Sequence, residues 1–143
     1  MKKLGIPFLI WGLLILGCSG AANVKSSCSS SGNAGRCTLK FGKVEGNPYE
    51  YKMEVSLPPS AKSAEVTAQI SSGKSALNVW FEDPDRKKVK VKVEPGQSAT
   101  LEGFARVQND MSKQLISLYF EPLGEGDQKK AEDVAVEVSY KLP

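Results

Sequence analysis

The chain of 143 residues contains no histidine. This absence removes Ser-His and Cys-His nucleophile pairs, zinc sites built on imidazole, and the commonest general base near neutral pH. Cysteine is also scarce, with three residues, and aromatic residues make up only 8% of the chain. The sequence therefore predicts a protein that is not an enzyme and that uses no cofactor.

An excess of charge of one sign is lacking as well. The chain has 19 Lys and Arg residues against 16 Asp and Glu residues, and two of its lysines, Lys2 and Lys3, belong to the extreme N-terminus. Nucleic-acid binding requires a basic surface that displaces counterions from phosphate groups. The nearly balanced charge therefore argues against a nucleic-acid partner.

A short match to an enzyme motif does not change this interpretation. Ser71-Ser72-Gly73-Lys74 fits the S-x-x-K pattern of acyl-transferring penicillin-binding proteins. Those enzymes also need a K-T-G motif, which this chain lacks. The match is therefore not taken as a catalytic site.

No hydrophobic run is long enough to span a membrane. The longest extends from Leu4 to Leu16 and is interrupted by glycine and proline. A spanning helix needs about 20 apolar residues, whereas the apolar part of a secretory signal needs about 7 to 15. With Lys2 and Lys3 before it, this run predicts a signal peptide over residues 1–17.

The residues at the end of the run carry a resemblance to a known family. Leu14-Ile15-Leu16-Gly17-Cys18 resembles the lipobox of bacterial lipoproteins, with Ile15 and Gly17 at the positions that the motif prescribes. The resemblance implies cleavage before Cys18, a lipid on that cysteine, and a protein held on a membrane of the cell envelope. Because Ser19 and not Asp follows the cysteine, it favours the outer membrane over the inner one.

The next segment, residues 18–37, is rich in Ser, Gly, Ala and Asn, and Val24 is its only large apolar residue. This composition predicts a flexible, lipid-anchored tether. Cys28 and Cys37 remain as a pair after Cys18 is assigned to the lipid, and an exported chain meets an oxidising compartment, so we expect a disulfide. A two-thiolate metal site is the alternative, but it lacks further ligands.

Residues 38–143 show the period of β-strands. In Tyr49–Leu57 every odd position is apolar and every even position is polar, as a strand with one wet face requires. Similar alternation recurs in about eight segments separated by turn-forming residues. Short strands with one apolar face each must pack two sheets together. We therefore expect an all-β domain, an antiparallel β-sandwich of immunoglobulin-like or jelly-roll type.

Two surface features stand out in this domain. Lys88, Lys90 and Lys92 share one face of a strand, and they either bind an anionic surface or prevent pairing at a sheet edge. Trp80 is out of step with its apolar neighbours, so it should face outward, as a platform for a sugar or partner or beneath a covering loop. These four residues are the predicted partner or ligand surface.

An acidic turn is the one metal candidate. Asp83 and Asp85 flank Pro84 between two strands, and their carboxylates could contribute to a calcium site. Asp and Pro also form turns without any metal, and the spacing lacks the ligands of a calcium loop. The turn is the favoured interpretation.

Together, these features predict a non-enzymatic lipoprotein of the cell envelope whose β-sandwich binds a protein or glycan partner. The alternative is a structural or assembly subunit of a larger envelope complex. No motif distinguishes the two.

Overall fold

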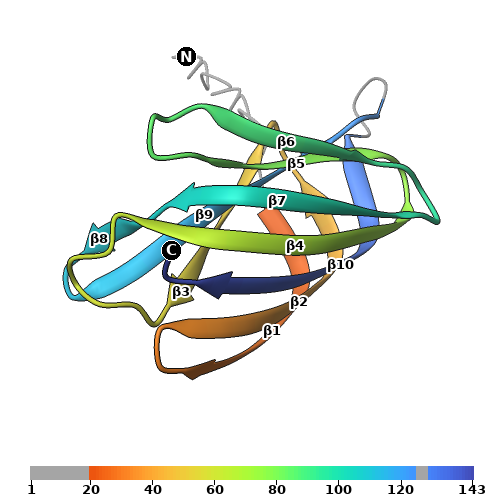
Figure 1. Ribbon diagram of the computed structural model, residues 1–143. Coiled ribbons are helices and arrows are strands. Elements are labelled where there is room, and N and C mark those ends of the chain that lie inside the picture. Colours follow the sequence, from red (N-terminus) through yellow and green to blue (C-terminus); the bar gives the residue numbers. More distant parts are fainter. Residues whose placement is uncertain (1–19, 125–128) are drawn as a thin grey trace, which may run out of the picture.

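The computed structural model describes residues 20–124 and 129–143. The predicted signal peptide and Cys18 lie outside the described residues. The described chain is built of β-strands arranged in two layers (Figure 1). The strands are β1 (Gly20–Ser31), β2 (Ala34–Glu45), β3 (Tyr49–Val55), β4 (Ser63–Lys74), β5 (Leu77–Glu82), β6 (Lys88–Val93), β7 (Ser98–Arg106), β8 (Gln108–Asp110), β9 (Lys113–Pro122) and β10 (Lys130–Lys141).

The strands form a sandwich of two antiparallel sheets, which confirms the predicted fold class. The first sheet, called sheet A here, has the order β1-β2-β10-β4-β7, and the second, sheet B, has the order β3-β9-β5-β6, with β8 also paired to β9. Apart from β1 and β8, eight strands divide equally between the sheets. Because β2, β3, β4 and β5 alternate from one sheet to the other, the connectivity is that of a jelly roll.

The core lies between the sheets and is made by the alternate apolar positions of each strand. Leu39 and Phe41 of β2, Ile70 of β4, Phe81 of β5 and Phe120 of β9 are at most 1% exposed. Phe41 contacts Phe120 across the core, with ring centroids 5.1 Å apart. The period-two pattern therefore predicts the core-facing side of these strands.

The tether prediction for residues 18–37 is wrong over the part that the structure describes. Residues 20–31 form β1, which pairs along its length with β2, and β2 itself begins at Ala34. The domain therefore begins at least as early as Gly20. Apolar residues are scarce here because β1 lies at the edge of sheet A, where hydrogen bonding to β2 fixes the backbone without a buried face.

The predicted disulfide is present, and it links these two strands. Cys28 lies directly opposite Cys37 in the β1–β2 register, and the structure joins them by a disulfide bond. Cys37 is buried in the core, whereas Cys28 is exposed. The bond therefore ties the edge strand to the core-facing side of its neighbour.

A tyrosine links the sheets at the end where β10 finishes. Tyr140 is 4% exposed, and its hydroxyl accepts a hydrogen bond from the backbone N–H of Ser56, just after β3, at 3.0 Å. To reach Ser56 the ring passes Gly35 of β2, where a β-carbon would clash with the tyrosine ring and its hydroxyl. Gly35 therefore provides the space through which sheet A contacts sheet B.

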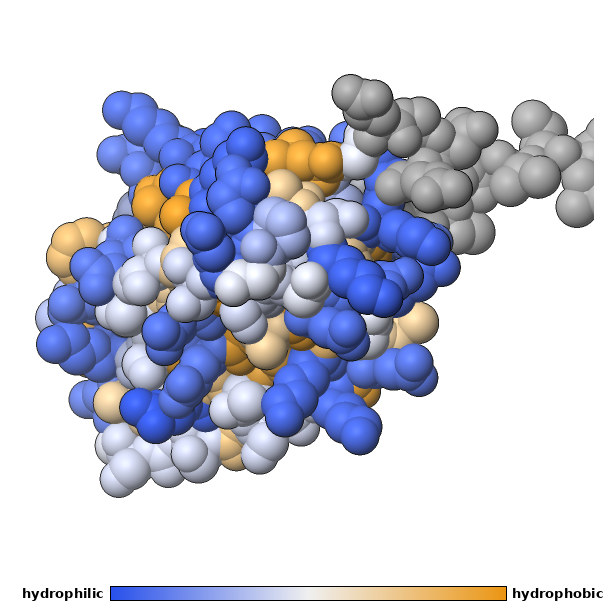
Figure 2. Space-filling model, turned by 90° about the vertical axis from the view of Figure 1, so that its right-hand side faces the viewer, coloured by the Kyte–Doolittle hydropathy of each residue, from blue (hydrophilic) through white to orange (hydrophobic). Residues whose placement is uncertain are grey.

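The described residues include no helix of the length and apolarity that crossing a bilayer requires. Figure 2 views the molecule from the right-hand side of Figure 1, where the β4–β5 and β6–β7 connections lie. Hydrophilic side chains cover most of this face, and the apolar ones form separate patches. This face therefore offers no continuous apolar surface.

Candidate functional site

The structure brings the four residues of the predicted surface together on the outer face of sheet B. Lys88, Lys90 and Lys92 are exposed on β6, the edge strand, and alternate with valines that face the core side. Trp80 of β5 lies directly opposite Lys90. The predicted shared face is therefore present at a sheet edge, where lysines also oppose pairing with other strands.

Trp80 faces outward but is not an open platform. Its side chain is 4% exposed because Tyr119 of β9 stacks on it, with ring centroids 5.5 Å apart and planes 11° from parallel. The Lys88 ammonium lies 4.7 Å from the centroid of the Trp80 ring, a cation–π contact. The indole is therefore covered by side chains of adjacent strands, not by a loop, and a sugar cannot stack on it in this arrangement.

A polar cluster continues from Tyr119 across the same face. Gln108 donates a hydrogen bond to Ser117 at 2.9 Å, and the Ser117 hydroxyl donates to Glu50 at 2.7 Å. Burial, followed by the nearby Glu50 and Glu82 carboxylates, raises the pKa of Tyr119 above its ordinary value. These polar groups are already bonded to one another, so the cluster stabilises the face more than it offers free groups to a ligand.

The acidic turn uses its carboxylate internally. One oxygen of Asp83 accepts hydrogen bonds from the backbone N–H groups of Asp85 and Lys87, at 2.9 and 2.8 Å. This is how aspartate stabilises a turn. Among the residues that the structure describes, no group of three or more Cys, Asp or Glu side chains has the arrangement of a metal site.

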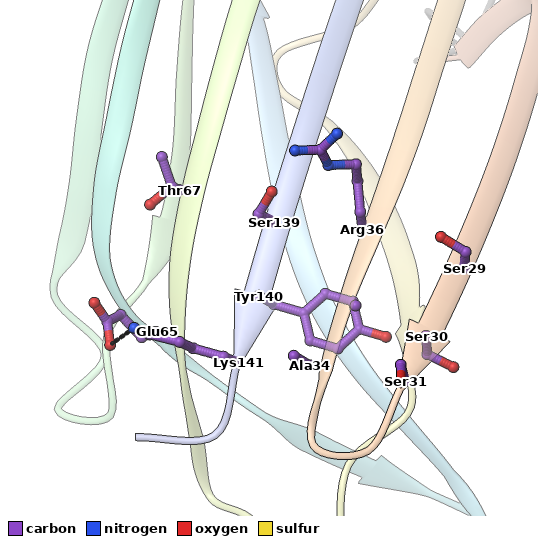
Figure 3. Close-up of a pocket in the computed structure, with 11 residues that line it drawn as sticks. Ser29, Ser30, Ser31, Ala34, Arg36, Glu65, Thr67, Ser139, Tyr140 and Lys141 are labelled. Atoms are coloured by element: carbon purple, nitrogen blue, oxygen red, sulfur yellow. Dashed lines mark ion pairs between the residues drawn. The ribbon is translucent and has the colours of Figure 1, made fainter.

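A groove that the sequence pattern did not predict lies on the outer face of sheet A. Its volume is about 610 Å³. Ser29, Arg36, Ser139 and Thr67 stand side by side at one level, on four adjacent strands (Figure 3). The next level consists of Ser31, Ala34, Lys141 and Glu65.

The groove is hollow because most of its side chains are small, and its charges are paired. Lys141 Nζ lies 3.4 Å from Glu65 Oε2, shown as the dashed line in Figure 3, and Arg36 Nη1 lies 3.2 Å from Glu137 Oε1. Serine and threonine hydroxyls can both donate and accept hydrogen bonds. The groove therefore presents many neutral polar groups and compensated charges.

Two further features extend this groove along sheet A. Phe104 of the edge strand β7 lies directly opposite Glu65, and its side chain is 53% exposed. A second hollow of about 330 Å³ lies on the same face, lined in part by Thr38, Gln69 and Glu137. We call the two hollows together with Phe104 the sheet A groove.

The sequence does contain a signal for the sheet A groove. Ser27, Ser29 and Ser31 occupy alternate positions, as do Glu137, Ser139 and Lys141. The second set is the wet face of an amphipathic strand. The first set gives no visible alternation of polar and apolar residues, because β1 has no apolar face. Its composition is therefore also that of a linker.

Comparisons with known proteins show a likeness of fold to solved structures. No protein-family model and no curated protein matches the chain. Among solved structures, the chain is similar to the family 11 carbohydrate-binding module of the cellulosomal cellulase Lic26A-Cel5E of Clostridium thermocellum. The sequences are 8% identical, the TM-score is 0.37, and the match covers 87% of this chain and 90% of that chain.

Proposed function

We propose that the protein is a non-enzymatic, lipid-anchored protein of the cell envelope that binds an uncharged glycan in the sheet A groove. The observation that carries the proposal is the groove of about 610 Å³ lined by hydroxyls and by ion-paired charges. A polyhydroxylated chain both donates and accepts hydrogen bonds, and so do the Ser and Thr side chains of the groove. The exposed Phe104 ring adds an apolar face on which a sugar ring can stack.

The paired charges decide between neutral and acidic glycans. An anionic ligand is favoured where cationic groups are unpaired and concentrated. In the groove, Lys141 and Arg36 each have a glutamate partner, so little net field remains. The lysines of β6 lie on the opposite sheet and do not contribute to this face.

The anchor would place the groove away from the membrane. Gly20, two residues after Cys18 in the sequence, pairs with Glu45 at one end of sheet A. The groove level of Ser31 and Ala34 lies at the other end of β1. Twelve residues of strand span about 40 Å at about 3.3 Å per residue. A lipid on Cys18 would therefore leave the groove open to the surrounding envelope.

Binding can be tested by affinity electrophoresis of the protein, purified in detergent, through gels that contain neutral or acidic polysaccharides. We expect retardation by a neutral polysaccharide. Ser139→Phe should abolish it, because Ser139 lies between Arg36 and Thr67 in the groove and a bulky ring there fills it. Phe104→Ala should weaken binding about two- to tenfold, since an aromatic contact contributes about 0.5–1.5 kcal/mol.

Lys90→Phe is the matched control, because it adds the same ring to an exposed strand on the other sheet. The proposal is wrong if no neutral polysaccharide retards the protein, or if Lys90→Phe abolishes retardation as strongly as Ser139→Phe. Recovery of one stoichiometric protein partner in place of any glycan would favour the accessory-subunit alternative.

A further inference from the structure

On one side of the sandwich, the edge strand of sheet A extends further than the edge strand of sheet B. Sheet A terminates in β1 and sheet B terminates in β3. The neighbour of β1, β2, packs over β3, with the Phe41 and Tyr51 ring centroids 5.6 Å apart. β1 therefore extends one strand beyond the edge of sheet B.

The inward face of β1 consequently has no strand opposite it. Val24, Ser26, Cys28 and Ser30 lie opposite core-facing positions of β2, yet all four are exposed. Ser26, Cys28 and Ser30 line a groove of about 600 Å³, and Tyr51, Met53 and Val55 of β3 are among its other lining residues. We call it the edge groove.

The free edge of β3 supplies backbone hydrogen-bonding groups to the edge groove. β3 pairs with β9 on one side only. Just beyond the strand, Tyr140 and Gln114 accept hydrogen bonds from the backbone N–H groups of Ser56 and Leu57. Among the described residues, no side-chain hydrogen bond reaches the backbone of Tyr49–Val55. The backbone groups available for pairing therefore end at Val55, because the N–H groups of Ser56 and Leu57 are bonded to side chains.

We propose that the edge groove binds an extended peptide segment of a partner protein, which adds to β3 as a further strand of sheet B. Strand addition uses the free backbone groups for affinity and alternate side chains for specificity. The space beside β3 and beneath β1 has the width of one strand, because β1 is the one strand of sheet A that extends beyond the edge of sheet B. An added strand would place alternate side chains beneath β1.

The outward side chains of β3 define the partner's chemistry. Glu50, Lys52 and Glu54 alternate in sign along the solvent face of the strand. Glu50 Oε1 accepts a hydrogen bond from Ser117 and Glu54 Oε2 lies 4.0 Å from Lys113 Nζ, and each of these contacts uses one oxygen of the carboxylate. Opposite charges that face each other across two strands stabilise the pairing, and like charges oppose it. The bound segment should therefore carry basic, acidic and basic residues at alternate positions, with compact residues between them that fit beside Ser26 and Ser30.

The probe is a labelled seven-residue peptide with valine at alternate positions and lysine, glutamate and lysine between them. Its charge order is the same in either direction, so it tests parallel and antiparallel addition together. We expect it to bind the full-length protein and to protect from hydrogen exchange those backbone amides of Tyr49–Val55 that do not already donate to β9. A peptide with glutamate, lysine and glutamate should bind about tenfold more weakly.

Ser26→Phe should reduce the peptide's affinity at least tenfold, because the ring occupies the edge groove. Ser27→Phe is the matched control, since Ser27 is exposed on the opposite face of the same strand. Absence of binding, equal effects of the two variants, or protection of amides elsewhere would overturn the proposal. Protection of β3 that rises with protein concentration alone would instead assign this edge to a second copy. Glycan binding is measured separately, so either proposal can fail without the other.

Discussion

Single residues decide how the two sheets are joined. Tyr140 belongs to sheet A, and its hydroxyl accepts a hydrogen bond from the backbone N–H of Ser56 beside sheet B. This contact depends on the absence of a side chain at Gly35, because the Tyr140 ring occupies the space that a β-carbon would fill. The pair is a residue-scale feature that alternation of apolar residues does not reveal.

We expect Gly35→Ala to lower the free energy of unfolding by about 1–3 kcal/mol, because the added methyl group forces the Tyr140 ring to move. Chemical denaturation measures this change. Gly20→Ala is the control, since a β-carbon at Gly20 would meet nothing within 4 Å. Equal stability of Gly35→Ala and Gly20→Ala would show that the ring moves at no cost.

The cover over Trp80 can be tested by fluorescence quenching. The only other tryptophan, Trp11, lies in the predicted signal peptide, so Trp80 would be the only tryptophan of the mature chain. Lys88→Ala should increase quenching by acrylamide, because the lysine lies over the indole ring. Lys92→Ala should leave quenching unchanged. If both variants behave alike, Lys88 does not cover the ring in solution.

Tyr119 predicts an effect at alkaline pH. Its raised pKa means that the folded protein favours the neutral phenol, while an unfolded tyrosine ionises near pH 10. The stabilisation is therefore fully present below pH 10 and is lost as pH rises through the raised pKa. The free energy of unfolding should fall more steeply above pH 10 in the wild-type protein than in Tyr119→Phe. Parallel curves would contradict this assignment.

At the scale of elements, β1 is an edge strand with two wet faces. It buries little apolar surface, so its attachment depends on the backbone ladder with β2 and on the Cys28–Cys37 bond. β6, at the far edge of sheet B, is different, because its valines contact the core and only its lysines are exposed. The first strand should therefore be the element most dependent on a covalent link.

We expect the double variant Cys28→Ser, Cys37→Ala to lose amide protection in β1 before it does so in β4 or β10. A disulfide that closes a loop of about ten residues contributes about 2.5–3 kcal/mol on the chain-entropy estimate. Hydrogen exchange resolved by residue measures the protection. Uniform loss across all strands would show that β1 does not open separately.

At the scale of the whole molecule, the position of the proposed lipid anchor would relate the two proposed sites to the membrane. The sheet A groove and the edge groove are both lined by residues from the second half of β1, Ser29 and Ser30 among them. A lipid at Cys18 would be joined to the first half. Both grooves would then face the envelope, not the bilayer.

Cys18→Ser, produced behind a leader that is removed without lipidation, should move the protein from the membrane fraction to the soluble fraction and reduce its mass by the attached lipid. A lipid supplies the membrane affinity that the hydrophilic face in Figure 2 does not. Fractionation with mass spectrometry of the wild-type protein measures both effects. Retention of the variant in membranes, with no lipid on the wild-type protein, would remove the anchor from the proposal.

The sequence by itself determined the fold class and most of the core. A strand with apolar residues at every second position is stable only when its apolar face is buried. Eight such strands bury these faces by packing as two sheets. The same alternation placed Lys88, Lys90 and Lys92 on an outer face. Cys28 and Cys37 were predicted as a pair because export and an even count leave them only each other.

Only the tertiary structure decided the rest. Local pattern carries no information on strand order, so the jelly-roll connectivity and the cover on Trp80 depended on which strands became neighbours. β1 has no local apolar signal, because an edge strand is fixed by hydrogen bonds to residues elsewhere in the chain. Both grooves arise from side chains of strands distant in sequence, whose proximity is created by packing.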